Sequence, residues 1–138
     1  MWRGPNAKVI AGGKADTVLM PATVVDGVTE AMNLYRDESF GPVVAMIRAR
    51  DEAEAIALAN DSAYGLQASV WSSKLERAHR VARALRAGTV HVNQYDEDDI
   101  TVPFGGYKQS GVGRDKSLHA FDKYTETKTT WIRIDSPV

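Results

Sequence analysis

The chain has 138 residues, of which 43% are hydrophobic and 25% are charged, and its formal net charge is -1. This length suits one folded domain and is short for a two-domain cofactor enzyme. The near-neutral charge gives no electrostatic basis for binding nucleic acid or an anionic membrane, and no apolar stretch is long enough to cross a bilayer. The lack of cysteine excludes disulfides, cysteine-based metal sites and a thiol nucleophile on this chain, and it is compatible with the cytoplasmic location that we expect.

The first part of the chain contains three candidate strands. Residues 7–11 are a short strand candidate that stops at two glycines, and residues 20–25 are a second. Pro21 places this second strand at a sheet edge or marks its start. Residues 43–47 form a near-continuous apolar run, which is typical of a buried strand.

The middle of the chain alternates helices with strands. Asp51 is the predicted N-cap of a helix, and Glu54 completes a capping-box-like pattern. The helix is expected to end near residues 60–62, and residues 66–71 form the next strand. A second helix begins at Ser72 and Ser73, with one apolar face made by Leu75, Ala78, Val81, Ala82 and Leu85.

Gly88 is a plausible C-cap for this second helix, and residues 89–93 form the third strand of the series. The order strand, helix, strand, helix, strand predicts an α/β fold, with βαβ units forming a mainly parallel sheet. An acidic loop at 96–99 and a glycine-rich loop at 105–113 follow. Residues 115–123 are predicted to form a short helix, and residues 125–134 alternate as a long terminal strand would.

Two segments carry the candidate chemistry. Residues 38–43, ESFGPV, place Glu38 two residues before Phe40 and a Gly-Pro turn. Read by spacing alone, Phe40 is a core residue and Glu38 a solvated loop residue. Residues 103–114, PFGGYKQSGVGR, lack the Lys-Ser/Thr that a P-loop requires after its second glycine, so a tight surface loop is the alternative.

These two segments occur in one order with three others: LANDSAYGL at 58–66, AGTVHVN at 87–93 and YTETKT at 124–129. Together they resemble the NAD(P)-dependent aldehyde dehydrogenase superfamily over roughly residues 8–134. The C-terminal part is most similar to gamma-glutamyl-gamma-aminobutyraldehyde dehydrogenases, and residues 26–41 are also similar to aromatic aldehyde dehydrogenases. The resemblance implies the C-terminal part of the catalytic domain over residues 1–124 and an oligomerisation strand and tail over 125–138.

The resemblance also implies roles for individual residues. Glu38 matches the glutamate that hydrogen-bonds the nicotinamide ribose, and Phe40 matches the phenylalanine beside the nicotinamide. Phe104 matches a residue of the aldehyde tunnel, and the loop before it faces the substrate entrance. Asp96 and Asp98 lie in that loop, so we expect either a preference for a cationic amino-aldehyde or simply a solvated acidic turn.

The sequence offers no catalytic residue for this chemistry. The family uses a cysteine thiolate, a general base, an oxyanion-holding asparagine and a cofactor-binding domain, none of which is recognisable here. His79, His91 and His119 are scattered and expected to be structural or solvated, no metal site has ligand spacing, and no Gly-x-Ser-x-Gly elbow is present. The basic helix at 74–86 is interpreted as a solvated face rather than a nucleic-acid site.

The sequence therefore predicts a fragment of an aldehyde dehydrogenase that is inactive by itself. NAD or NADP is the cofactor expected of the complete enzyme, and none is expected to bind this chain alone. Two alternatives stay open, a non-catalytic oligomerisation module and a small hydrolase on a borrowed portion of the fold. Self-association through residues 125–134, or association with a full-length aldehyde dehydrogenase, is the expected partnership, with no nucleic acid and no membrane.

Overall fold

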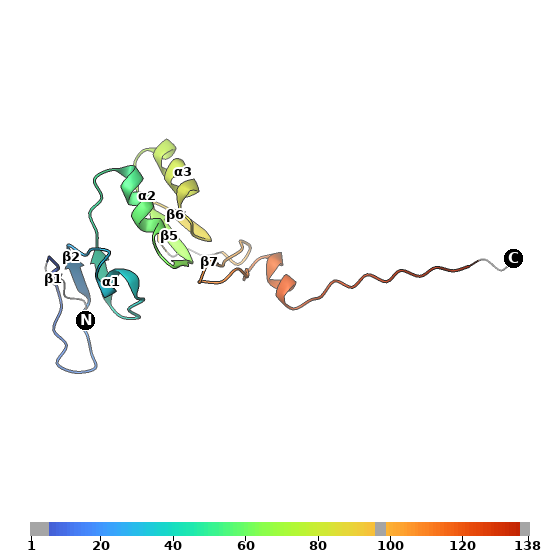
Figure 1. The fold of residues 1–138 in the computed structure, drawn as a ribbon, viewed down its shortest axis with the longest axis horizontal. Helices are drawn as coiled ribbons and strands as arrows, with labels where there is room; N and C mark the ends of the chain where they lie inside the picture. Colours follow the sequence, from blue (N-terminus) through green and yellow to red (C-terminus); the bar gives the residue numbers. More distant parts are fainter. Residues whose placement is uncertain (1–5, 96–98, 136–138) are drawn as a thin grey trace.

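The computed structural model describes residues 6–95 and 99–135. Its N-terminal unit is a three-stranded sheet of β1 (Lys8–Ala11), β2 (Thr23–Asp26) and β3 (Val43–Met46), in that order (Figure 1). β1 pairs antiparallel with β2, and β2 pairs parallel with β3. Because β2 is the central strand, Pro21 marks the approach to a strand and not a sheet edge.

One face of this sheet carries the small core of the unit. Val25, Val28 and Met32 are 1%, 4% and 7% exposed, and α1 (Asn33–Arg36) follows directly. The other face of β3 is open, with Val44 60% exposed. The prediction that β3 is a fully buried strand is therefore wrong, because a parallel strand is buried only when both faces of its sheet are covered.

The second unit begins with the helix that was expected after Asp51. The Asp51 side chain accepts a hydrogen bond from the Glu54 N–H at 2.9 Å, so the predicted N-cap of α2 (Glu52–Asn60) is confirmed. The Glu54 carboxylate accepts from the Arg50 N–H, which makes this cap a variant of the capping box.

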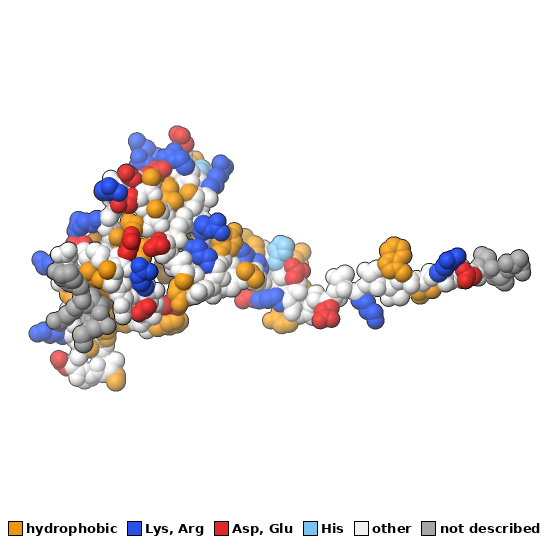
Figure 2. Space-filling model, viewed as in Figure 1, with side chains coloured by type: hydrophobic (Ala, Val, Ile, Leu, Met, Phe, Trp, Pro, Cys, Tyr) orange, Lys and Arg blue, Asp and Glu red, His pale blue; other side chains and the backbone are white. Residues whose placement is uncertain are grey.

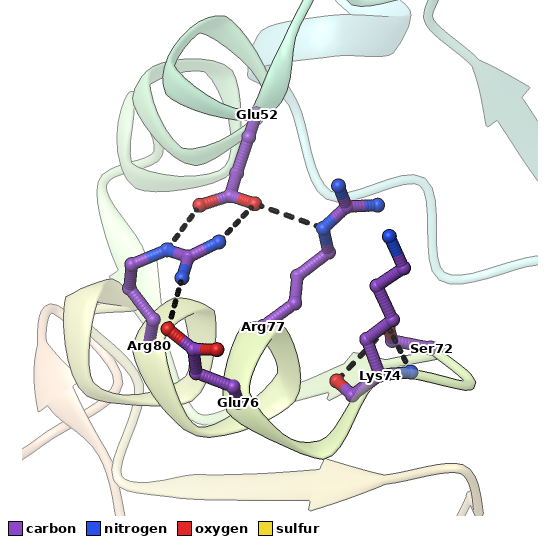
Figure 3. Close-up of polar contacts among 6 residues, drawn as sticks. All are labelled: Glu52, Ser72, Lys74, Glu76, Arg77 and Arg80. Atoms are coloured by element: carbon purple, nitrogen blue, oxygen red, sulfur yellow. Dashed lines mark hydrogen bonds and ion pairs between the residues drawn. The ribbon is translucent and has the colours of Figure 1, made fainter.

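The same unit contains a complete βαβ crossover. β5 (Gln67–Val70) leads through α3 (Leu75–Ala84) to β6 (Thr89–Val92), and the two strands pair in parallel. Glu52 of α2 accepts hydrogen bonds from Arg80 of α3 at 2.7 and 3.0 Å and forms an ion pair with Arg77 at 3.2 Å (Figure 3). The basic face of α3 is thus partly used to bind α2.

The sequence predicted one mainly parallel sheet, and the observed topology corrects this prediction. Among the described residues, β3 belongs to the first sheet, β5 and β6 form a second, and β4 (Tyr64–Gly65) pairs antiparallel with β7 (Tyr107–Lys108) in a third. The sequence alternation identifies parallel crossovers, but it does not specify which strand edges meet, because that depends on contacts between distant segments.

Gly88 does not act as the C-cap of α3. The helix ends at Ala84 with Leu85 as its C-cap, and the Gly88 N–H donates to the Gly65 carbonyl at 3.0 Å. A Cβ on Gly88 would lie 1.7 Å from the Gly105 carbonyl oxygen. The glycine is required here because two backbone segments approach each other, which local sequence does not reveal.

The C-terminal region contains a short helix and an extended tail. The 3-10 helix η1 (Leu118–Lys123) agrees with the predicted short helix at 115–123. Residues 125–135 project away from the rest as an extended segment without strand pairing, and Trp131 is 91% exposed (Figure 1). The described segment has no strand partner within this chain, and the expected strand pairing with a neighbouring chain stays a prediction.

The chain has a large surface for its mass. It exposes 11197 Å², whereas a compact monomer of 15.1 kDa exposes about 7,100 Å². Hydrophobic side chains appear over the visible surface and along the projecting tail (Figure 2). Within the described residues, no helix is both long and apolar enough to span a membrane.

Candidate functional site

A cleft of about 700 Å³ lies where the segment after α1 meets the end of α2 and the β4–β5 region. Its lining includes the polar residues Tyr35, Glu38, Asn60, Tyr64, Gln67 and Gln109. Of the predicted site residues that the structure describes, Glu38 is the one in the lining of this cleft. An exposed carboxylate at the edge of such a cleft can accept hydrogen bonds from two ligand hydroxyls.

The segment that contains Glu38 is attached to the end of α2 through Tyr35, three residues earlier. The Tyr35 hydroxyl donates a hydrogen bond to Asp61 Oδ2 at 3.0 Å, just past the end of α2. Burial and the neighbouring Asp61 carboxylate raise the pKa of Tyr35 to about 12. The hydroxyl therefore keeps its proton, and this hydrogen bond, throughout the neutral pH range.

Phe40 is presented to solvent. Its side chain is 91% exposed and its φ is 40°, in the left-handed region that non-glycine residues seldom occupy. The Pro42 carbonyl beyond it accepts from the Thr23 N–H at 2.8 Å, which fixes this turn to β2. Phe40 does not line the cleft that contains Glu38.

Phe104 lies at the base of the glycine-rich loop. Its N–H donates to the Asp115 carbonyl at 2.8 Å, and the Asp115 N–H donates back at 2.6 Å. The Lys116 ammonium lies 5.4 Å from the centre of the half-buried Phe104 ring. Phe104 does not line the cleft either, so the described residues place the cofactor and substrate candidates in separate regions.

Asp96 and Asp98, the predicted substrate-entrance residues, lie outside the described residues. Their neighbour Asp99 accepts hydrogen bonds from the Thr101 N–H and hydroxyl, both at 2.7 Å. These bonds lower the pKa of Asp99 below its usual value, with a further contribution from the Lys116 charge. This end of the acidic loop is therefore negatively charged at neutral pH.

Two residues near the cleft were not singled out from the sequence. The Lys108 ammonium donates to the Asn60 and Ser62 carbonyls at 2.8 and 2.9 Å, and the Asn60 amide bonds to Ala84 and Arg86 backbone groups. Both residues lie in the quoted motifs LANDSAYGL and PFGGYKQSGVGR, which is the only signal that the sequence offers. Their partners are 24 to 48 residues away, so spacing could not identify them.

The three histidines occupy unrelated positions. His91 is 7% exposed in β6 and lies 3.4 Å from the Gln67 amide, while His119 lies 3.3 Å from Asp122. His79 is exposed on α3. In the described part of the chain, no group of three potential ligand residues could hold a metal ion. Among the described residues, the site places a carboxylate in a cleft but brings together no paired nucleophile and base.

Comparison with known proteins identifies the family. The model of the aldehyde dehydrogenase family matches residues 3–130. NADP/NAD-dependent aldehyde dehydrogenase PuuC of Escherichia coli (strain K12) is 56% identical over 116 residues, which are 84% of the chain and 23% of that protein. Aminoacetaldehyde dehydrogenase of Pseudomonas aeruginosa is 50% identical over 123 residues, which are 88% of the chain and 25% of that protein.

Solved structures agree with these sequence matches. Indole-3-acetaldehyde dehydrogenase AldA of P. syringae, as a mutant in complex with NAD+ and IAA, superimposes with a TM-score of 0.86 at 54% identity. Aldehyde dehydrogenase KauB from Pseudomonas aeruginosa also gives 0.86, at 57% identity, and both alignments cover 93% of the chain and 27% of the solved chain. The chain thus spans about a quarter of the length of the relatives it matches.

The matched region and the solved neighbours confirm the predicted α/β class and the resemblance, including its similarity to gamma-glutamyl-gamma-aminobutyraldehyde dehydrogenase. The match extends over nearly all of the chain and agrees in sequence and in fold. The chain belongs to the aldehyde dehydrogenase family.

Proposed function

We propose that this chain works as one part of an NAD(P)-dependent aldehyde dehydrogenase that oxidises an aldehyde to a carboxylic acid. The observation that carries the proposal is the family match over residues 3–130 in a chain that covers about a quarter of its relatives. The absence of cysteine indicates that the nucleophile comes from elsewhere in the enzyme. By itself the chain is expected to be inactive and to bind no cofactor.

Glu38 and Phe40 are the proposed cofactor contacts. The Glu38 carboxylate would accept hydrogen bonds from the two hydroxyls of the nicotinamide ribose, and the Phe40 ring would orient the nicotinamide. Glu38 lines the cleft and Phe40 is 91% exposed, so both side chains are accessible to a ligand, which supports these proposed contacts. Relatives were solved with NAD+ bound, and PuuC is described as using NADP or NAD, so either cofactor fits the proposal.

A chimera tests this proposal directly. Residues 3–130 would replace the aligned segment of the E. coli relative, which keeps its own catalytic cysteine and cofactor-binding domain. We expect aldehyde-dependent NADH formation by the chimera and none by the isolated chain. Glu38→Gln in the chimera should raise the KM for NAD+ about tenfold, because a charge-assisted hydrogen bond to the ribose is weakened.

Two results would contradict the proposal. A folded chimera without any turnover would remove its basis, and so would turnover by the isolated, contaminant-free chain. Glu30→Gln, at an exposed position before α1, is the matched control for Glu38→Gln and should leave the KM for NAD+ unchanged.

The acidic loop before Phe104 supports a proposal about the substrate. Asp96 and Asp98 would concentrate an amino-aldehyde at the entrance by electrostatic attraction. In the chimera, replacing both with asparagine should raise the KM for amino-aldehydes alone, most clearly at low salt. An equal change for neutral aldehydes would show that the loop is only a solvated acidic turn.

Self-association through residues 125–134 is the second candidate, and it is favoured by the unpaired, exposed tail. Trp131, Ile132 and Ile134 are 91%, 78% and 86% exposed. Such a segment can add as a strand to another chain, either a copy of this one or a full-length aldehyde dehydrogenase. We place this assembly in the cytoplasm, which the cysteine-free sequence suits.

A further inference from the structure

The C-terminal end of α2 is bound from two sides by segments that carry proposed site residues. On one side, the Tyr35 hydroxyl bonds to Asp61 Oδ2 at 3.0 Å and lies 3.4 Å from the Leu58 carbonyl oxygen. Tyr35 and Glu38 belong to the same short segment and line the same cleft. The end of α2 therefore anchors the segment that presents Glu38.

On the other side, the glycine-rich loop is attached to the same end of α2. The Lys108 ammonium bridges the Asn60 and Ser62 carbonyls at 2.8 and 2.9 Å, where the helix dipole favours a cation. The Gln109 N–H donates to the Ala63 carbonyl at 3.0 Å, beside the β4–β7 pairing. These bonds connect the loop to α2 through several neighbouring residues.

The backbone at Lys108 indicates that this attachment is specific. Its φ is 54°, and a non-glycine residue stays in this region only when its surroundings over-determine the conformation. The Ser110 N–H donates to the Tyr107 carbonyl at 3.1 Å, so a tight turn holds this backbone conformation. From this turn the half-buried Lys108 side chain donates to two carbonyls at once.

A loop closed by hydrogen bonds connects Lys108 to Phe104. Arg114 Nη1 donates to the Gly106 and Gly113 carbonyls, both at 2.9 Å, and the Arg114 guanidinium lies 5.4 Å from the Tyr107 ring centre. The Phe104 and Asp115 backbones close the base of the loop with two hydrogen bonds. The loop between Phe104 and Lys108 is therefore bonded both internally and at its base.

We infer that the C-terminal end of α2 sets the separation between the cofactor segment and the aldehyde segment, with Tyr35 and Lys108 as the two positioning residues. The inference rests on the proposed function, which gives Glu38 and Phe104 their roles. Neither Tyr35 nor Lys108 needs to touch the substrate or cofactor. Each acts by holding the segment whose residue does.

The test is a pair of substitutions in the active chimera with opposite expected effects. Lys108→Met should raise the KM for the aldehyde about tenfold, because a lost charge-assisted anchor releases the Phe104 loop. Tyr35→Phe should instead raise the KM for NAD+ severalfold while the aldehyde KM stays unchanged, because it releases the Glu38 segment. Lys108→Arg should recover most of the aldehyde affinity, since a guanidinium can also donate to the two carbonyls.

Matched controls are Lys14→Met and Tyr124→Phe, at exposed positions away from α2, and both should leave the two KM values unchanged. Variants that lower only the yield of folded protein or kcat, with no split between the KM values, would show a purely structural role and overturn the inference. If Lys108→Met does not fold, Lys108→Arg and Tyr35→Phe still test it. A folded parent chimera without turnover would instead overturn the proposed function, which distinguishes the two failures.

Discussion

Gly88 and Gly105 show how single residues bring distant segments of this family member together. A Cβ added to Gly88 would lie 1.7 Å from the Gly105 carbonyl oxygen and 2.7 Å from its carbonyl carbon. Both are backbone atoms, so no side-chain rotation relieves the overlap. The contact keeps the segment before β6 against the base of the loop that carries Phe104.

Gly88→Ala should therefore destabilise the chain by about 1–3 kcal/mol, the usual cost of forcing extra atoms into a packed region. The measurement is the urea midpoint of unfolding at constant m-value. Gly41→Ala is the control, because its added Cβ meets only the Ser39 carbonyl oxygen at 3.5 Å. Equal midpoints for the two variants would show that the Gly88 contact is looser than the structure indicates.

The site residues differ in how far sequence could identify them. Glu38, Phe40 and Phe104 are proposed as site residues because they match family residues, whereas their own spacing favoured plain loop or core positions. Tyr35 and Lys108, the proposed positioning residues, could not be found this way, because the contacts that suggest their role depend on distant partners. Those partners lie 26 residues away for Tyr35 and up to 48 for Lys108.

At the scale of the elements, α2 and α3 are joined by charges that the sequence presented as a solvated face. Arg80 donates to both carboxylate oxygens of Glu52, and Arg77 adds an ion pair (Figure 3). The hydrogen bond from Arg80 is the main cause that lowers the pKa of Glu52 below its ordinary value of 4.5. This pairing holds α2 against α3, which packs on β5 and β6.

Glu52→Gln should lower the thermal midpoint at pH 7, and the difference from the parent chain should vanish in acid. The Glu52 pKa is lower in the folded state, so its stabilisation is present above pH 4.5 and is lost as the pH falls through the folded pKa. Thermal melts from neutral to acidic pH measure this change. Glu76→Gln is the control, since Glu76 is 95% exposed and lies 3.7 Å from Arg80.

A pH-independent difference in thermal midpoint between Glu52→Gln and the parent chain would attribute the effect to packing or helix propensity instead of charge.

The helices and strands themselves follow local sequence rules. The N-cap at Asp51 and the parallel β5–α3–β6 crossover were predicted correctly, since capping and apolar periodicity act within a few residues. The wrong C-cap at Gly88 came from the same local reasoning applied to a long-range contact.

At the scale of the whole molecule, the chain exposes far more surface than a compact monomer of its mass would. The chain exposes 11197 Å², about 4,000 Å² above the expectation for a compact monomer of its mass. Open faces such as that of β3 and the projecting tail contribute to this area. This large exposed surface supports the proposal that the chain acts within a larger assembly.

Removing residues 125–138 should shift the chain toward the monomer in light scattering after size-exclusion chromatography. The tail presents unpaired backbone groups and apolar side chains, and Ile132→Pro should have a similar effect because proline cannot donate to a strand ladder. Ile132→Val keeps the strand propensity and serves as the control. An unchanged mass distribution for all three variants would assign association to another surface.

The sequence by itself determined the family, the α/β class, the absence of a cysteine nucleophile and the positions of the main helices. These properties depend on residue identity, ordered motifs and periodicity within short windows. The tertiary structure decided which strand edges pair, which glycine is sterically required, and that the terminal segment has no strand partner in this chain. It also decided that Tyr35 and Lys108 meet at the end of α2, because such contacts arise only when segments far apart in the chain are packed together.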